Sequence, residues 1–191
     1  FHELGHEMQN QPHLWNGGYD GSPFTFSGGV EVSVNIFAKA AMDKFAPLAN
    51  AGQNSGWGWS VYPGQVLTRA RATISDAGKP GFAQKDQYPF FFSLADGLGW
   101  PMYRQVLSSY VADAVNQASA FPTTDQQKRD QWLIRWSRFS GYNMVEYMVR
   151  RWKLPVSEQA IQTVNAMNLP MWLPASTRID GFTLPANGNK Q

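Results

Sequence analysis

The first seven residues constrain the fold of this chain most, because they place two histidines four positions apart. Residues 1–7 read FHELGHE. On an α-helix, positions i and i+4 share one face, so His2 and His6 can bind a single metal ion. Glu3, one step round the helix, could accept a proton from water at that metal. The pattern predicts a helix that carries a metal site, but it also arises by chance and needs a third ligand.

Glu31 is the candidate third ligand. Apolar side chains follow at helical spacing through residues 30–41, after the potential N-cap Ser27, and Pro47 is expected to end this helix. Glu31 then lies in the first turn, and Asn35 on the same face could orient its carboxylate. A carboxylate in a first turn is also favoured by the helix dipole alone, so a purely structural role for Glu31 remains open.

His13 is the competing ligand. It follows Pro12 in a predicted turn, and its spacing does not match the downstream histidine of the other large class of zinc peptidases. We interpret it as a loop residue or as a residue that supports a ligand from behind. The chain has no cysteine, so nitrogen and oxygen atoms must hold any zinc ion.

These features resemble the enhancin and mucinase zinc peptidases. The shared residues are the His-Glu-x-x-His motif at 2–6, Trp15, and the stretch GVEVSVNI at 29–36. That family has its third ligand, a glutamate, in a Glu-Val-x-Val-Asn stretch. The likeness continues at 91–100 and 132–157 and covers most of residues 1–174. The resemblance implies a gluzincin in which His2, His6 and Glu31 bind one Zn²⁺ ion per chain and Glu3 is the general base.

The family resemblance also implies a function. It predicts a secreted or cell-surface zinc endopeptidase that cleaves glycoproteins, with O-glycosylated mucins as substrates. Because the sequence begins inside the predicted metal-binding helix, we expect it to be the carboxyl-terminal part of a longer peptidase, without its upstream part. The alternative is a non-catalytic helical scaffold, or a glycoprotein-binding module of a larger secreted protein. Metal content distinguishes the two, because a scaffold has no need to bind zinc.

The rest of the chain predicts helices. No stretch shows sustained strand alternation, and the predicted helices span residues 90–94, 101–115, 124–141, 143–152 and 157–164. With 191 residues, of which 43% are apolar, the chain can bury one core. We expect a mainly α-helical bundle, the helical half of a zincin-type peptidase, over residues 1–174, followed by an extended tail at 175–191. The aromatic and methionine stripes of these helices are interpreted as core.

Aromatic residues in loops are candidates for substrate contact. Trp15 and Tyr19 lie between the two ligand helices, and Trp57 and Trp59 are flanked by glycines. Aromatic faces pack well against sugar rings, and Arg69, on a short predicted helix, could bind an acidic sugar or a carboxylate. Each candidate has an alternative role: Trp15 and Tyr19 could hold their loop against the core, and Arg69 could be an ordinary surface charge.

Charge and hydropathy exclude two classes of partner. The 16 basic residues are scattered and nearly balanced by 14 acidic ones, with a formal net charge of +2, so no nucleic-acid partner is expected. No apolar run reaches the length of a membrane span. We expect a monomer whose partner is its glycoprotein substrate.

Overall fold

The computed structural model describes residues 2–11, 14–15, 21–26, 29–49, 84–116 and 121–173. Its helices are α1 (His2–Gln9), α3 (Val30–Ala49), α5 (Gln84–Val115), α6 (Asp125–Ser140), the π-helix η1 (Glu146–Arg151) and α7 (Glu158–Ala166). Within these ranges there is no β-strand, only an isolated bridge between Asn143 and Met171. The prediction of a mainly α fold is confirmed.

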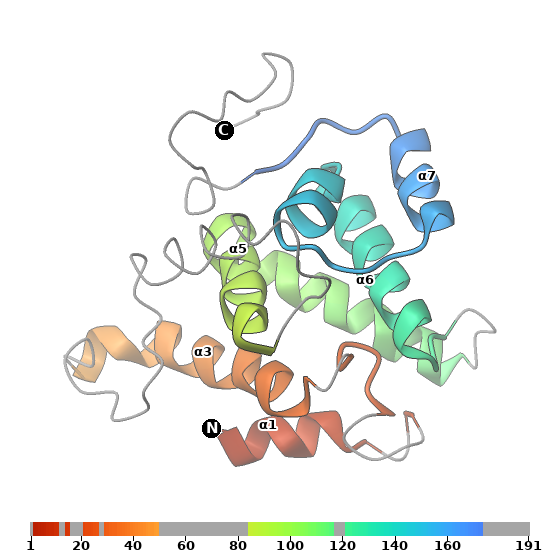
Figure 1. Cartoon of the computed structure of the whole chain (residues 1–191). Coiled ribbons are helices and arrows are strands. Elements are labelled where there is room, and N and C mark those ends of the chain that lie inside the picture. Colours follow the sequence, from red (N-terminus) through yellow and green to blue (C-terminus); the bar gives the residue numbers. More distant parts are fainter. Residues whose placement is uncertain are drawn as a thin grey trace.

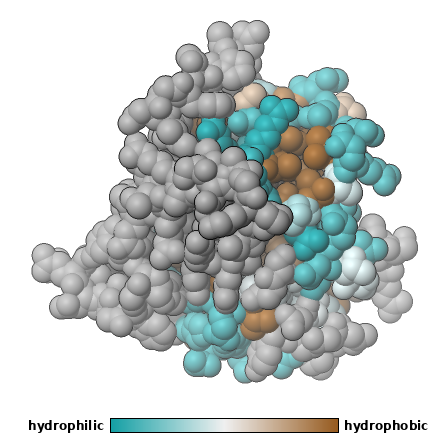
Figure 2. Space-filling model, in the orientation of Figure 1, coloured by the Kyte–Doolittle hydropathy of each residue, from teal (hydrophilic) through white to brown (hydrophobic). Residues whose placement is uncertain are grey.

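The helices form two groups with α5 between them (Figure 1). At one end α1 packs against α3, and α3 in turn packs against α5. At the other end α5 packs against α6, and α6 packs against α7. The described part of the surface in Figure 2 is mostly hydrophilic, with hydrophobic residues visible between hydrophilic ones at the upper right. None of the helices in the described ranges has the length and apolar character needed to cross a bilayer.

An aromatic cluster fills the space between α5 and α6. Trp132 of α6 contacts Phe91 edge-on at 5.5 Å between ring centroids, and Trp136 contacts Tyr103 at 4.9 Å. Phe90 stacks on Tyr147 of η1 at 5.7 Å. These six side chains are fully or almost fully buried. The aromatic stripes predicted from helical spacing are therefore core, and the large rings hold the second half of the chain together.

Local capping signals determine where α6 and α7 begin and end. Thr124 caps α6 with a capping box shared with Gln127, and Gly141 ends the helix in the left-handed conformation, with φ 71°. Ser157 caps α7, and its side chain accepts a hydrogen bond from the backbone nitrogen of Ala160 at 3.2 Å. The predicted start at Thr124, the end at Gly141 and the cap at Ser157 are confirmed.

Three expectations about the helices were wrong. The helix α3 continues past Pro47 to Ala49. The helix α5 begins at Gln84, before the predicted start at residue 90, although it does break at Gly99. The predicted α-helix over 143–152 is instead the shorter π-helix η1. Asn143 does not cap η1, whose N-cap is Val145, but its Oδ1 accepts a hydrogen bond from the backbone nitrogen of Val145 at 2.9 Å just before the helix.

Candidate metal centre

The helix α1 presents His2 and His6 side by side toward α3. Their ring centroids are 4.8 Å apart and the ring planes are nearly perpendicular, at 89°. Gly5 lies between them in sequence and is buried. A Cβ atom at Gly5 would lie 2.5 Å from both the Cγ2 atom and the carbonyl oxygen of Val34. Glycine therefore allows α1 to approach α3 closely enough for the two histidines to reach residues of the second helix.

Glu31 completes a cluster of three side chains. Its carboxylate, in the first turn of α3, lies 3.2 Å from His2 Nε2 and 3.5 Å from His6 Nε2. One ligand atom from each residue can be chosen so that all three lie within 4.8 Å of one another. The Glu31 side chain is 60% exposed, whereas those of His2 and His6 are 18% and 15% exposed. The histidines form the floor of the site, and the carboxylate lies at its rim.

Asn35 determines how the His2 ring is oriented. Its Nδ2 donates to the carbonyl oxygen of Glu31 at 2.6 Å, which leaves Oδ1 facing His2 Nδ1 at 2.9 Å. An amide oxygen can only accept, so His2 Nδ1 must carry the proton. In the neutral ring the lone pair is therefore on Nε2, the atom nearest Glu31. The sequence predicts that Asn35 orients the Glu31 carboxylate, whereas in the structure Asn35 contacts the Glu31 backbone and the His2 ring.

Gln9 orients the His6 ring in the same way, and this role was not predicted from the sequence. Its Oε1 lies 2.8 Å from His6 Nδ1, while its Nε2 donates to the carbonyl oxygen of Val30 at 2.7 Å. His6 Nδ1 is therefore also the donor, and the lone pair of the neutral His6 ring faces Glu31. The available signal was the spacing: Gln9 follows His6 by three positions on the same helix, where side chains meet.

The donor set fits a zinc ion. Two imidazole lone pairs and a carboxylate converge on one point, and a cation between them would satisfy all three groups. Two histidines and one glutamate are also a ligand set of catalytic zinc sites, which keep a fourth position open. Glu3, on the same helix next to His2, is exposed to solvent. The structure thus brings His2, His6, Glu31 and Asn35 together.

Comparison with known proteins identifies the family. Residues 1–153 match the family described as Peptidase M60, enhancin and enhancin-like. This chain belongs to the M60 peptidases. None of the curated proteins matches the sequence.

Two solved structures share the fold of this M60 chain. Both are titled as crystal structures of a functionally unknown conserved protein from Bacillus anthracis str. Ames, the first in a mutant form. The mutant has a TM-score of 0.63 at 20% identity and covers 92% of this chain and 32% of its own. The other has a TM-score of 0.59 at 18% identity and covers 93% of this chain and 34% of its own. The M60 chain thus spans about a third of the length of these structures, and the likeness shows the fold alone.

Of the five predicted substrate residues of the M60 chain, the structure describes only Trp15. Trp15 is only 6% exposed, and its Nε1 donates to the carbonyl oxygen of Gln9 at 2.6 Å. It also contacts Phe24 edge-on and stacks parallel to Phe121. This burial favours the packing role of Trp15 over substrate contact, because its ring faces are covered by protein. The other four candidates lie outside the described residues: Tyr19, Trp57, Trp59 and Arg69.

Three tyrosines are unsuited to stabilising a reacting oxygen atom. Tyr103, Tyr110 and Tyr147 are fully buried in the aromatic cluster, and burial raises the pKa of each hydroxyl above its usual value. The Tyr147 hydroxyl donates to the carbonyl oxygen of Phe90 at 2.6 Å. All three remain neutral packing residues.

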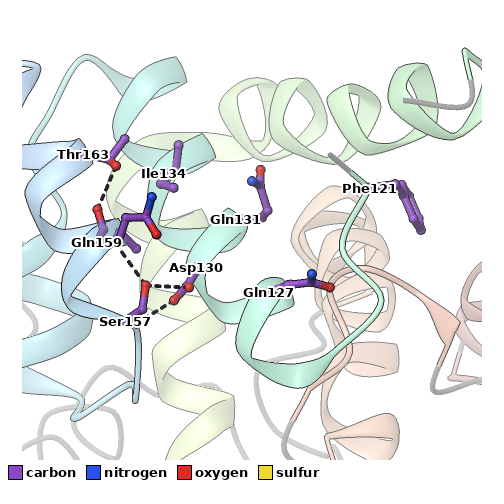
Figure 3. A pocket seen from close by; sticks show the side chains of 9 residues that line it. Phe121, Gln127, Asp130, Gln131, Ile134, Ser157, Gln159 and Thr163 are labelled. Carbon is purple, nitrogen blue, oxygen red and sulfur yellow. Dashed lines mark hydrogen bonds between the residues drawn. The ribbon is translucent and has the colours of Figure 1, made fainter. Parts of the chain in front are cut away.

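A pocket of about 280 Å³ lies between α6 and α7, and its lining includes no residue of the metal cluster (Figure 3). Its polar wall is built around Asp130. That carboxylate accepts hydrogen bonds from the backbone nitrogen and the hydroxyl of Ser157, at 2.8 and 2.7 Å. Asp130 thus anchors the start of α7 on α6.

Proposed function

We propose that this chain carries the zinc site of an endopeptidase that cleaves glycoproteins, with O-glycosylated mucin-type proteins as the substrate class. The observation that carries the proposal is the meeting of His2, His6 and Glu31. The Glu31 carboxylate lies 3.2 and 3.5 Å from the two Nε2 atoms, and one ligand atom of each residue lies within 4.8 Å of the others. Membership of the M60 family supports peptidase chemistry, and the mucin specificity and secretion rest on the resemblance to enhancins and mucinases.

The proposal assigns the residues of this chain to metal binding, to positioning of the ligands and to proton transfer. His2, His6 and Glu31 would hold one zinc ion, while the Asn35 and Gln9 amide oxygens accept from the Nδ1 atoms of the two rings and would leave both Nε2 atoms free to bind it. When bound, zinc supplies Lewis-acid chemistry, which lowers the pKa of water to about 7 and polarises a carbonyl group. Glu3 accepts a proton from the attacking water and delivers it to the leaving amine. Glu3 is exposed on α1, next to His2 in sequence.

The replacement Glu3→Gln tests the role of Glu3. The amide has nearly the same shape but cannot accept the proton, so we expect zinc content to stay at the wild-type level while turnover falls by at least about 100-fold. Zinc is measured by elemental analysis, and turnover by mass spectrometry of a cleaved mucin-type glycopeptide. Glu7→Gln, which changes another exposed carboxylate of α1, is the matched control and should keep full activity. Substantial hydrolysis by Glu3→Gln would remove Glu3 from the base role.

The substrate class needs a separate experiment. The full-length protein is given one mucin-type glycopeptide and the same peptide after enzymatic deglycosylation. We expect cleavage of the glycosylated form only. Equal cleavage of both forms would leave the zinc chemistry intact and contradict the mucin specificity.

A further inference from the structure

Gln9 is a polar side chain that is completely buried at the end of α1. Its exposed fraction is 0%, although both of its side-chain polar atoms need hydrogen-bond partners. The Oε1 atom faces His6 Nδ1 at 2.8 Å. The Nε2 atom donates to the Val30 carbonyl at 2.7 Å and to Ser33 Oγ at 2.8 Å. The amide therefore joins His6 to the first turn of α3.

The orientation of this amide is fixed by groups that cannot exchange roles. The Val30 carbonyl only accepts, so rotating the amide by 180° would place two oxygen atoms 2.7 Å apart. Ser33 Oγ is itself held, because it contacts the Gly29 carbonyl at 3.1 Å and Thr25 Oγ1 at 2.8 Å. Gln9 can therefore present only an acceptor to His6.

The support for Gln9 reaches two other segments of the chain. The Trp15 indole nitrogen donates to the Gln9 carbonyl at 2.6 Å and so holds its backbone. Lys128 of α6 is buried and donates to the Thr25 carbonyl at 3.0 Å, which ties the residues around Gln9 to the second half of the chain. Gln9 is thus held at both its backbone and its side chain.

We propose that Gln9 is a positioning residue that keeps the proton of His6 on Nδ1, so that Nε2 stays free to bind the metal. The purpose of this arrangement rests on the proposed zinc function. The tautomer itself, however, is a property of this chain and can be measured without metal. Groups that orient a metal-binding histidine from behind typically change metal affinity by about 10- to 100-fold when they are removed.

Two replacements separate positioning from packing. Gln9→Met keeps the length of the side chain and removes the acceptor. Gln9→Glu keeps an acceptor for His6, and its other carboxyl oxygen can take a proton and donate to the Val30 carbonyl, but it then supplies one hydrogen bond where the amide supplies two, to Val30 and Ser33. A merely structural role would therefore impair both variants, whereas a positioning role predicts that Gln9→Glu rescues what Gln9→Met loses.

The experiment measures His6 in the full chain after chelator treatment, with ¹⁵N-labelled histidine and long-range ¹H–¹⁵N correlation. We expect the Nδ1–H tautomer in the wild type and in Gln9→Glu, and loss of this single tautomer in Gln9→Met. Zinc affinity, from competition with a chelator, should fall about 10- to 100-fold in Gln9→Met and stay within about threefold of wild type in Gln9→Glu. Gln131→Met, on α6, is the control and should change neither quantity.

Three outcomes overturn the inference. The first is an Nε2–H tautomer of His6 in the wild type, which requires no variant to fold. The second is an unchanged tautomer and affinity in Gln9→Met, and the third is an equal loss in both variants. If the wild type binds no zinc but the tautomer responds as expected, the positioning role of Gln9 stands and the proposed zinc function fails.

Discussion

At the scale of single residues, two neutral amides decide which nitrogen of each histidine faces Glu31. Asn35 comes from α3 and orients His2 of α1, so this hydrogen bond crosses between the helices. Gln9 orients His6 within α1 but is itself held by α3. Both imidazoles therefore depend on the contact between the two helices, and the site cannot be assembled by α1 alone.

Removing the amide of Asn35 should weaken zinc binding without unfolding the protein. We expect Asn35→Ala to lower zinc affinity by about 10- to 100-fold, because the His2 ring loses the group that orients it. Alanine has the higher helix propensity, so α3 itself should not be weakened. Chelator competition measures the affinity. Asn165→Ala, at an exposed position of α7, is the matched control, and an Asn35→Ala affinity equal to that of this control would contradict the role.

The sequence could predict the ligands but not all of their supports. Local patterns predicted the spacing of His2 and His6 and the place of Glu31 in the first turn of a helix. The family resemblance then implied that the three residues bind one metal ion. The role of Gln9 depends on Val30 and Ser33, more than 20 positions away, and no local pattern reveals that contact. For Trp15 the sequence left substrate contact and packing against the core both open, and the burial of its ring favours packing.

At the scale of elements, the close packing of α1 on α3 sets the geometry of the site. Lys39 of α3 continues this layer toward α5, because its buried ammonium group pairs with Asp96 at 2.8 Å. The metal cluster thus stands on a helix that is fixed on both sides. Positions held this firmly are what a zinc site requires of its ligands.

A side chain at Gly5 should push α1 away from α3. In Gly5→Ala the added Cβ would lie 2.5 Å from Val34, partly against backbone, and relief requires the helices to move apart. We expect a loss of about 1–3 kcal/mol in the free energy of unfolding and a weaker zinc affinity. Chemical denaturation and chelator competition measure the two effects. Leu4→Ala, at a position 62% exposed on the same helix, should change stability by less than about 0.5 kcal/mol; a Gly5→Ala protein as stable as this control would contradict the close packing.

The break in α5 gives a second prediction at this scale. Gly99 has φ 83° and ψ 161°, a conformation open almost only to glycine. Gly99→Ala should lower the free energy of unfolding by about 1–3 kcal/mol through backbone strain and leave zinc affinity unchanged, because α5 carries no ligand. Gly97→Ala, two positions earlier on the helix, should instead be neutral or stabilising by up to about 1 kcal/mol. Thermal unfolding compares the two variants, and equal stabilities would refute the strain argument.

Element boundaries were predictable where the signal is local. Thr124, Gly141 and Ser157 cap their helices through neighbours in sequence, and each was read correctly from the chain. The π-helix η1 has no side-chain cap, and its Tyr147 and C-cap Trp152 contact Phe90 of α5, more than 50 positions earlier in the sequence. The continuation of α3 past Pro47 is likewise invisible to a rule that treats proline as a stop.

At the scale of the whole molecule, the two helices of the site and the helices behind them have separate tasks. The ligands come from α1 and α3, and the aromatic cluster of α5, α6 and η1 forms the support. Two buried lysines join the halves: Lys39 through Asp96, and Lys128 through the Thr25 carbonyl. The mainly α fold could be predicted because helical spacing is a local pattern. The contacts that link the halves join residues far apart in the sequence, so no local pattern predicts them.

Zinc content of the full chain tests the central claim most directly. After dialysis against zinc and removal of the excess, elemental analysis should find about one equivalent in the wild type, because the three ligands form a single site. His13→Ala, which removes the one histidine outside the cluster, should keep that equivalent, and His6→Ala should lose it. A wild type without bound zinc, or equal zinc in His6→Ala and the wild type, would contradict the assignment of His2, His6 and Glu31.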